Sequence, residues 1–380
     1  MQFIDLKAQY NHIKEDINEN IQVVLESNQY MMGPFVKELE QKLAEYVGVK
    51  HCVTCANGTD ALQLALMAWD IKAGDAVFLP SFTFYATAEV VSLAGATPIF
   101  VDTNPRTFNI DTKKLEKAII EVQKEGTLVP RVIIPVDLFG QPADFEAIYA
   151  LAKRYNLLIL EDGAQGFGGS INGKKACSFG DIATTSFFPA KPLGCYGDGG
   201  ALFTDNDTYY DKLKSLRIHG KGKFKYDNVR VGLNSRLDTL QAGILLPKLR
   251  VFKGYELDNR NTFAQIYSNS LENVVEVPYV PKNMISSWAQ YTVLLNSSEE
   301  REYLQNKLKE RDIPTMIYYP TPLHKQKVYE AYNFNLSDLN VSEEISQRCL
   351  SLPMHPYLEE KKIGIICDEI KTVVKEYRHG

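Results

Sequence analysis

The sequence predicts an α/β protein whose mainly parallel β-sheet lies between layers of helices, followed by a smaller C-terminal α+β domain. Three observations carry this prediction. From about residue 45, short apolar runs alternate with stretches of helical periodicity, which is typical of βαβ units. The run at 157–162 (LLILED) is apolar on both faces, as expected for a strand covered by helices on both sides. After about residue 250 the pattern shifts to fewer strands and more Lys and Glu.

Each predicted strand is a short apolar run, and each predicted helix has apolar residues spaced to cover one face. We expect strands at 51–55, 75–80, 97–102, 131–140, 157–162, 183–189 and 200–205. We expect helices at 58–69, 86–94, 112–125, 144–155 and 206–216. In such sheets ligands bind outside the carboxyl ends of the strands, so the residues just after strands are the candidates for function.

The stretch 238–256 is expected to be helical, with a kink at Pro247, because proline lacks the N–H that a helix needs. We place the end of a large domain here, so that it covers residues 1–250 and includes an N-terminal arm. Residues 251–380 are expected to form the small domain. It would contain a helix near 300–311, a turn at 318–320 and a terminal helix near 359–377.

Composition indicates an ordinary globular protein and excludes several classes. Of the 380 residues, 45% are hydrophobic and 23% charged, and the net charge of −5 gives no overall attraction to nucleic acid or anionic lipid. The six cysteines are too scattered for a disulfide framework, and the Cys52-x-x-Cys55 pair lacks the second pair of a zinc site. No apolar stretch is long enough to span a membrane, and the first residues do not read as a signal peptide. We therefore expect a cytoplasmic enzyme without a metal site.

The segment 57–62 (NGTDAL) follows a predicted strand and opens a predicted helix. The backbone N–H groups of Gly58 and Thr59 would lie at the helix N-terminus, where they and the helix dipole favour a phosphate group. A plain helix start capped by Thr59 or Asp60 is the alternative.

Asp162 comes at the exit of the 157–162 strand, in the sequence EDGAQ. A carboxylate at this point can hold a protonated ring nitrogen, because a buried charge needs an opposite partner. A structural aspartate that caps a helix is the alternative.

Residues 186–202 (SFFPAKPLGCYGDGGAL) are the most informative stretch. Lys191 lies in a glycine-rich loop stiffened by Pro189 and Pro192, between two apolar strands. A surface lysine needs no such frame, whereas a lysine that forms a Schiff base must be aimed and must lose its proton. Ser186, at the start of the stretch, is a second candidate for contact with a phosphate. A structural loop with an incidental lysine stays open as the alternative.

Residues 168–175 (GGSINGKK) nearly match a phosphate-binding P-loop. Lys175, however, stands where Ser or Thr would bind magnesium. The Asn172-Gly173 pair favours a β-hairpin turn instead. We therefore disfavour nucleotide hydrolysis.

Three further features of the sequence are weaker signals. Phe84, after the strand at 75–80, is either a core aromatic or a face for a planar ring. His324 is a weak candidate for substrate contact. The basic loop at 217–230 would meet a diphosphate or a partner subunit, with a solvated loop as the alternative.

In their order along the chain, these features are what pyridoxal phosphate (PLP) requires in fold-type I aminotransferases. The sequence closely resembles the family of sugar aminotransferases that act on nucleotide-linked keto sugars, essentially over its whole length. The stretches that carry the resemblance are ANGTDALQ (56–63), PSFTFYATAE (80–89), EDGAQ (161–165), SFFPAKPLGCYGDGGA (186–201) and VGLNSRLDTLQAGIL (231–245). The resemblance implies a PLP cofactor, bound by a large domain with a seven-stranded sheet.

The resemblance also implies a role for each matching residue. Lys191 resembles the Schiff-base lysine, and Asp162 resembles the partner of the pyridinium nitrogen, so both are the expected catalytic residues. The other expected cofactor contacts are Gln165 to the ring hydroxyl, Phe84 stacked on the ring, Gly58, Thr59 and Ser186 on the phosphate, and Asn234 from across a dimer interface. Arg236, Tyr318, Tyr319 and His324 are the expected substrate contacts. Gly163 departs from the family pattern, because alanine is expected there.

The version GCYGDGG of the lysine loop is similar to that of family members that aminate C-3 of a UDP sugar. The overall resemblance implies amino transfer to UDP-2-acetamido-2-deoxy-3-oxo-D-glucuronate, in lipopolysaccharide O-antigen or other glycan precursor synthesis. The habit of the family implies L-glutamate as the amino donor, which leaves as 2-oxoglutarate. UDP-3-oxo-GlcNAc and a dTDP-3-oxo-6-deoxyhexose are the alternative acceptors. The expected assembly is a homodimer with active sites at the subunit interface, without nucleic-acid or membrane partners.

Two other functions stay open on the same fold. A PLP-dependent sugar dehydratase would carry histidine in place of Lys191. A regulatory protein would keep the fold and the cofactor without turnover, and the sequence contains no recognisable DNA-binding segment.

Overall fold

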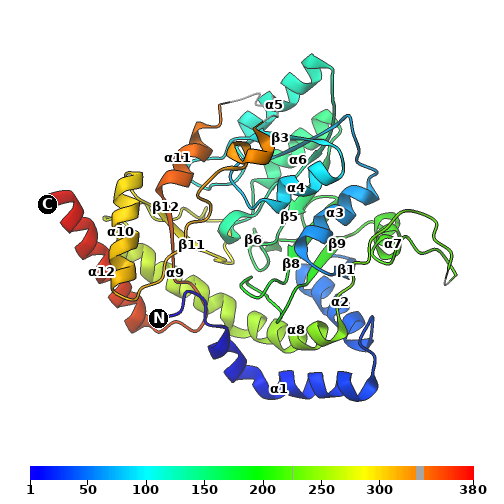
Figure 1. The fold of residues 1–380 in the computed structure, drawn as a ribbon, viewed down its shortest axis with the longest axis horizontal. Helices are drawn as coiled ribbons and strands as arrows, with labels where there is room; N and C mark the ends of the chain where they lie inside the picture. The colour runs from blue at the N-terminus through cyan, green and yellow to red at the C-terminus, as the bar shows by residue number, and fades with distance from the viewer. Residues whose placement is uncertain (225, 331–337) are drawn as a thin grey trace.

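The computed structural model describes residues 1–224, 226–330 and 338–380. Its centre is a seven-stranded sheet in the order β1-β9-β8-β5-β4-β2-β3 (Figure 1). Strand β9 runs antiparallel to β1 and β8, and the other neighbouring strands are parallel. The strands are β1 (His51–Cys55), β2 (Asp75–Pro80), β3 (Thr97–Val101), β4 (Val129–Ile133), β5 (Leu158–Asp162), β8 (Ile182–Ser186) and β9 (Gly200–Thr204). The predicted α/β fold with a mainly parallel sheet is confirmed.

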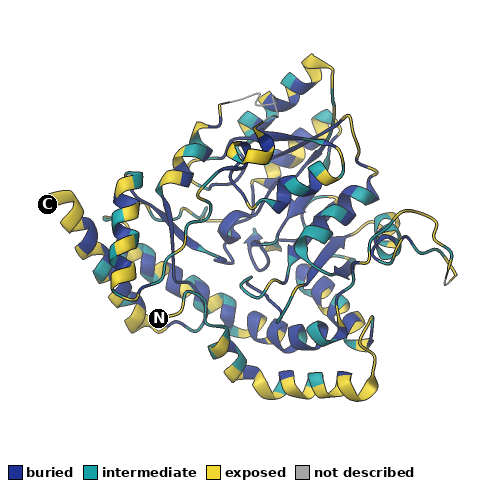
Figure 2. Ribbon diagram, viewed as in Figure 1, coloured by how far each residue is buried: buried dark blue, intermediate teal, exposed yellow. Residues whose placement is uncertain are grey.

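Helices cover both faces of the sheet, whose strands are coloured as buried in Figure 2. Alternate side chains of a strand enter two different cores. In β2, Val77 and Leu79 pack on one face, whereas Ala76 and Phe78 pack on the other. The first face is covered by α3 (Gly58–Ala68), α4 (Ala86–Leu93) and α7 (Asp207–Leu216). The second is covered by α2 (Pro34–Val47), α5 (Thr112–Glu125), α6 (Phe145–Tyr155) and α8 (Thr239–Val251). Burial on both faces explains why these strands are apolar runs.

The strand predicted at 131–140 is shorter than expected and is corrected. Strand β4 ends at Ile133, and Leu138–Gly140 forms a 3₁₀ turn. Pro135 has no N–H to donate to a ladder, and Phe139 and Gly140 adopt positive φ angles of 58° and 108°. This turn matters for the site, because it lies beside the end of β5.

The stretch that nearly matched a P-loop forms a β-hairpin. Strands β6 (Ser170–Ile171) and β7 (Lys174–Lys175) pair in antiparallel fashion across Asn172 and Gly173, whose φ angles are 50° and 83°. Two positive φ angles in a two-residue loop define the tight hairpin turn that Asn-Gly favours. The hairpin prediction is confirmed. Strand β10 (Met284–Ile285) joins β6 as a third strand.

A second hydrophobic core contains residues between Phe263 and Val374. Around it lie α9 (Leu257–Leu271), β11 (Tyr291–Leu294), α10 (Ser298–Glu310), β12 (Cys349–Leu352) and α12 (Glu360–His379). Helix α11 (Asn340–Arg348) packs on α10 and contributes Ile345 to a separate cluster. The predicted helices near 300–311 and 359–377 therefore exist. The N-terminal helix α1 (Leu6–Ser27) packs along α8 at the bottom of Figure 1.

The predicted helix at 238–256 contains its irregularity in a different place from the one expected. Pro247 lies inside α8, and the α-helical geometry gives way further on, to a π-helical turn at Phe252–Glu256 that leads directly into α9. The domain boundary near residue 250 stays a prediction.

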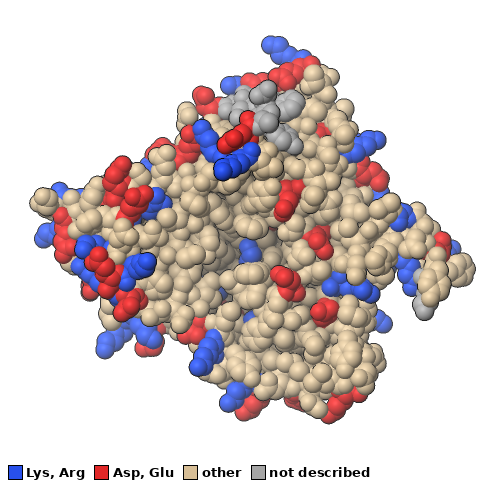
Figure 3. Space-filling model, in the orientation of Figure 1, with Lys and Arg blue, Asp and Glu red and all other residues tan. Residues whose placement is uncertain are grey.

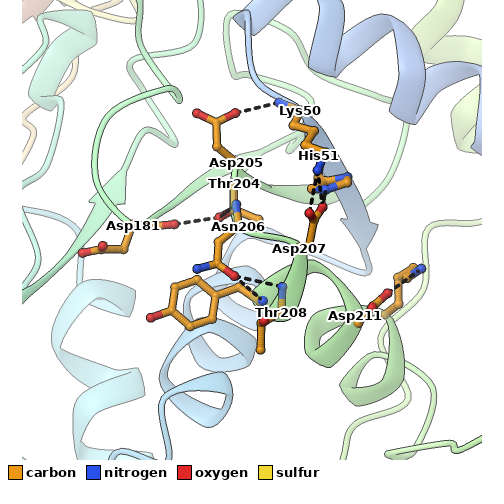
Figure 4. Close-up of polar contacts among 11 residues, drawn as sticks. Lys50, His51, Asp181, Thr204, Asp205, Asn206, Asp207, Thr208 and Asp211 are labelled. Atoms are coloured by element: carbon orange, nitrogen blue, oxygen red, sulfur yellow. Dashed lines mark hydrogen bonds and ion pairs between the residues drawn. The ribbon is translucent and has the colours of Figure 1, made fainter.

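The edge of the sheet where β1 begins carries a cluster of charged residues (Figure 4). Lys50 and His51 both contact the carboxylate of Asp207 at the start of α7, and the Lys50 N–H donates to Asp205. These contacts tie α7 to β1 and leave the carboxylates paired.

Within the described ranges, no group of three or more His, Cys, Asp or Glu side chains is arranged to hold a metal ion. No helix among those residues combines the length and the apolar character of a membrane span.

Candidate active site

The carboxyl ends of β1, β2, β5 and β8 lie at one edge of the sheet, because these strands run in the same direction. The segments that leave them carry Gly58, Phe84, Asp162 and Ser186. The parallel topology therefore brings together residues that are up to about 130 positions apart in the sequence. Figure 3 shows that this face of the molecule is hollowed near its middle, over the region where Figure 1 places β6 and β8.

Asp162, the last residue of β5, is buried and held by two donors. The Thr87 hydroxyl donates to its Oδ2 atom at 2.8 Å, and the Ala164 N–H donates to Oδ1 at 3.3 Å. Burial raises the pKa of Asp162, and the Thr87 and Ala164 hydrogen bonds and the Lys191 charge act in the opposite direction. The carboxyl is thus kept from water but oriented, as a partner for a cation must be.

Lys191 lies in the loop between β8 and β9, which folds back on itself. The Lys191 N–H donates to the Phe188 carbonyl at 2.9 Å, and the Cys195 N–H donates to the Phe187 carbonyl at 2.7 Å. Burial lowers the pKa of the Lys191 amine, while the negative charge of Asp162 acts to raise it. The fold therefore favours the neutral amine that a nucleophilic lysine needs.

Gln165 is buried, and both ends of its side-chain amide are engaged. Its Oε1 atom accepts from the Phe139 N–H at 2.7 Å, and its Nε2 atom donates to the Tyr319 hydroxyl at 3.0 Å. The ring of Tyr319 lies 6.1 Å from that of Phe84, centroid to centroid. Phe84 itself is 53% exposed, so its ring is available to a ligand. The structure thus connects three of the predicted site residues.

Helix α3 begins beside Ser186, the last residue of β8. The side chain that caps the helix is Asn57, which accepts from the Asp60 N–H at 2.7 Å. The alternative interpretation, a cap formed by Thr59 or Asp60, is therefore wrong. A Cβ atom on Gly58 would lie 2.7 Å from the Ser186 Cβ atom, so only glycine allows this close approach. The first N–H groups of a helix have no partner within it, so those of Gly58 and Thr59 remain available beside the Ser186 hydroxyl.

The other predicted residues lie around this centre. Ser235 accepts a hydrogen bond from the Ala56 N–H at 3.1 Å, which places the segment 234–236 against the start of α3. Asn234 is exposed, and Arg236 is half-buried. The Arg236 Nε atom has no hydrogen-bond partner in the part of the chain that the structure describes. Tyr318 is half-buried, with its ring 6.3 Å from that of Phe3.

His324 is placed differently from what a substrate contact requires. It is buried, and its Nδ1 atom lies 2.6 Å from the Ser81 hydroxyl and its Nε2 atom 3.0 Å from Glu343. Both ring nitrogens are therefore occupied by the protein, which supports a structural role. The basic loop projects beyond α7, at the right of Figure 1, and Lys225 within it lies outside the described residues.

The structure adds the roles of two residues that were not predicted and a reason for the departure at Gly163. The roles of Thr87 and Ser235 were not predicted, although Thr87 follows the end of β2 and so satisfies the rule that singled out Phe84. The glycine at position 163 also has a local reason. A Cβ atom there would lie 2.6 Å from the Cys177 Sγ atom, so the departure from alanine is coupled to the packing of Cys177.

A lysine with a lowered pKa that interacts electrostatically with a buried carboxyl, at the sheet edge where a helix start offers free N–H groups, is typical of enzyme sites that hold an anionic cofactor through a lysine. The comparison with known proteins is more specific. The chain matches, and belongs to, the DegT/DnrJ/EryC1/StrS aminotransferase family over residues 11–371. The family and the transaminase class predicted from the motifs are confirmed.

Two curated relatives cover nearly the whole chain. UDP-2-acetamido-2-deoxy-3-oxo-D-glucuronate aminotransferase of Pseudomonas aeruginosa is 48% identical over 368 residues, which are 97% of this chain and 98% of the relative. UDP-N-acetyl-3-dehydro-alpha-D-glucosamine 3-aminotransferase of Acidithiobacillus ferrooxidans is 39% identical over 99% of this chain and 98% of the relative.

Two solved structures extend the comparison to the fold. A family member from Brucella abortus has a TM-score of 0.95 and 48% identity, with all of both chains covered. NtdA from Bacillus subtilis, solved with bound cofactor PMP (the amine form of PLP), has a TM-score of 0.86 and 30% identity over 98% of this chain and 83% of that one.

Proposed function

We propose that this protein is a PLP-dependent aminotransferase that moves an amino group from L-glutamate to a nucleotide-linked keto sugar. The preferred acceptor is C-3 of UDP-2-acetamido-2-deoxy-3-oxo-D-glucuronate. The observation that carries the proposal is the electrostatic interaction of Lys191, whose pKa is lowered by burial, with the buried Asp162. The 48% identity to the P. aeruginosa enzyme supports the choice of acceptor.

The residues fit the cofactor in charge and in shape. The N–H groups of Gly58 and Thr59 and the hydroxyl of Ser186 would hold its phosphate, Asp162 its ring nitrogen and Gln165 its ring hydroxyl. Phe84 would lie against the ring. Bound PLP supplies an aldehyde that takes up amines and a ring that withdraws electrons when its nitrogen is protonated.

The chain's own contribution to the reaction is proton handling and orientation. The neutral Lys191 Nζ atom takes the proton from Cα of the amino donor, and the same atom delivers a proton to the sugar carbon that receives the amine. Asp162 would face the ring nitrogen of the cofactor, because Thr87 holds the carboxyl in place.

The acceptor carboxylate and the partner subunit are parts of the same proposal. Arg236, whose Nε atom is buried without a partner among the described residues, would bind the C-6 carboxylate of a uronate. A homodimer would cover the exposed apolar residues of the projecting loop, where Phe224 is 75% and Val229 54% exposed, and would bring Asn234 to the neighbouring site. We place the reaction in the cytoplasmic synthesis of lipopolysaccharide O-antigen or other glycan precursors.

The test of the amino-transfer step is Lys191→Ala in the full-length protein. This variant is expected to lose transamination and the absorbance of covalently attached cofactor, and to keep its fold by circular dichroism. Lys212→Ala removes a surface lysine paired with Asp70 and is the matched control. Transamination retained by Lys191→Ala would contradict the assignment.

The test of the acceptor is a panel of UDP- and dTDP-linked keto sugars with glutamate, with products identified by mass and NMR. We expect amination at C-3 of the UDP uronate. UDP-3-oxo-GlcNAc is the alternative that the A. ferrooxidans relative supports. Arg236→Met should reduce kcat/KM for the uronate more than for neutral sugars, and an equal reduction would exclude its proposed contact. Dehydration of the sugar without amine transfer would identify a dehydratase.

A further inference from the structure

Two carboxyl groups that the proposed mechanism does not use are neighbours of Asp162 in the structure. Asp137 and Glu161 are fully buried, and their side chains are hydrogen-bonding neighbours. The groups that face them are carboxyl, thiol and phenol groups, namely Asp162, Cys177 and Tyr149, and no cation is among them within the described chain. Two ionised carboxylates that are buried side by side would repel each other strongly, because little water is present to screen their charges.

The hydrogen bonds around the pair indicate where a proton belongs. Both oxygens of Glu161 accept backbone N–H groups, from Cys177 and Phe179. Asp137 Oδ1 accepts the Ala143 N–H at 3.0 Å, whereas Oδ2 has no conventional donor among the described residues. An O–H on Glu161 would supply the missing donor. Burial raises the pKa of Asp137 to about 7 and that of Glu161 well above its ordinary value.

The pair connects the two segments that shape the site. The Asp137 N–H donates to the Asp162 carbonyl at 3.1 Å, and Asp137 begins the turn in which the Phe139 N–H donates to Gln165 Oε1. On the other side, a Cβ atom at Gly166 would lie 2.3 Å from Asp137 Oδ2, so the loop after Asp162 closes tightly on this carboxyl. A movement of the pair would therefore displace both Asp162 and Gln165.

We propose that Asp137 and Glu161 are positioning residues that share one proton, and that this proton holds the segment from Asp162 to Gln165 in the orientation it presents to the cofactor. The pair then has one negative charge in place of two, and it joins the 137–140 turn to the end of β5. The proposal rests on the proposed cofactor site for its consequence, but not for the shared proton itself.

The first test measures the proton directly. Infrared spectra of the full-length protein are expected to contain the carbonyl band of a buried protonated carboxyl at neutral pH. Asp137→Asn replaces the shared proton by an amide hydrogen, so Glu161 ionises and the band should disappear, whereas Asp207→Asn on the surface should leave it unchanged. Absence of the band in the wild type, or its persistence in Asp137→Asn, would overturn the proposal.

The second test measures positioning. Asp137→Ala leaves a buried carboxyl without its partner, and we expect kcat/KM to fall at least about tenfold, with a weaker circular dichroism signal from the bound cofactor. Asp137→Asn keeps the hydrogen bond and should restore both to within about threefold of the wild type. If Asp137→Ala does not fold, the infrared spectra and the activity of Asp137→Asn still test the proposal. Equal loss in Asp137→Asn and Asp137→Ala, or an unchanged cofactor signal in a folded Asp137→Ala, would exclude the positioning role.

Discussion

The Thr87 hydroxyl donates a hydrogen bond to the Oδ2 atom of Asp162 at 2.8 Å, and thereby links the first turn of α4 to the end of β5. The two residues are 75 positions apart in the chain. Burial raises the pKa of Asp162, and the Thr87 hydrogen bond opposes this rise. The contact therefore favours the ionised form of a carboxyl in a buried position.

Thr87→Val removes this hydroxyl and keeps the shape of the side chain. Hydrogen bonds to charged groups contribute about 1.5–3 kcal/mol, so we expect kcat/KM to fall roughly 10- to 150-fold. The loss should be largest at low pH, because the pKa of Asp162 rises without the donor. Steady-state rates across pH would measure this, and Thr87→Ser should recover most of the activity. A pH profile identical to that of the wild type would contradict the argument.

The contact between Gln165 and Tyr319 predicts energetic coupling. Tyr319→Phe removes the acceptor of the Gln165 Nε2 hydrogen bond, which should weaken cofactor retention by about 1 kcal/mol. Gln165→Leu also leaves the Phe139 N–H without its acceptor and should cost more. A double-mutant cycle on the apparent cofactor dissociation constant should give a cost below the sum of the single effects. Strict additivity would show that the contact does not matter for cofactor binding.

Gly58→Ala tests the close approach of α3 to Ser186. The added Cβ would lie 2.7 Å from the Ser186 Cβ and 3.3 Å from its Cα atom, so the serine must move. Overpacking of this kind costs about 1–3 kcal/mol, and we expect a lower Tm and a higher cofactor dissociation constant. Adding Ser186→Gly should restore the Tm but not the cofactor affinity, because the hydroxyl is then missing. If the Tm of Gly58→Ala equals that of the wild type, the segment is less tightly packed than described.

The buried His355 predicts that the free energy of unfolding decreases at acid pH. Burial first, and then the nearby Arg260 charge, lower its pKa from 6.5 to about 4. A histidine kept neutral in the folded state contributes stability above pH 6.5, and this contribution is lost as the pH falls toward 4. The loss is roughly 3 kcal/mol at about 1.4 kcal/mol per unit. Urea unfolding between pH 7 and about 4 should show a steeper decline for the wild type than for His355→Gln; parallel curves would exclude this residue as the cause.

The sequence by itself determined the large-scale organisation and the central chemistry. The alternation of apolar runs and helical periodicity predicted the sheet because a strand covered on both faces must be apolar, and this is a local property. Strands β1 and β2 and helix α5 have the predicted bounds. Lys191 and Asp162 could be recognised for the same reason. The Pro and Gly residues around Lys191, and the strand that ends at Asp162, lie within a few residues of each in the sequence.

The tertiary structure alone decided which partners hold these residues. The contacts of Thr87 with Asp162, Ser235 with Ala56, and Tyr319 with Gln165 join segments that are 75 to 179 positions apart. It also decided that both His324 nitrogens are occupied by Ser81 and Glu343. The sequence alone could not exclude a substrate contact for this histidine. Side-chain hydrogen bonds and burial depend on how helices and loops close over the sheet, and no local pattern encodes that closure.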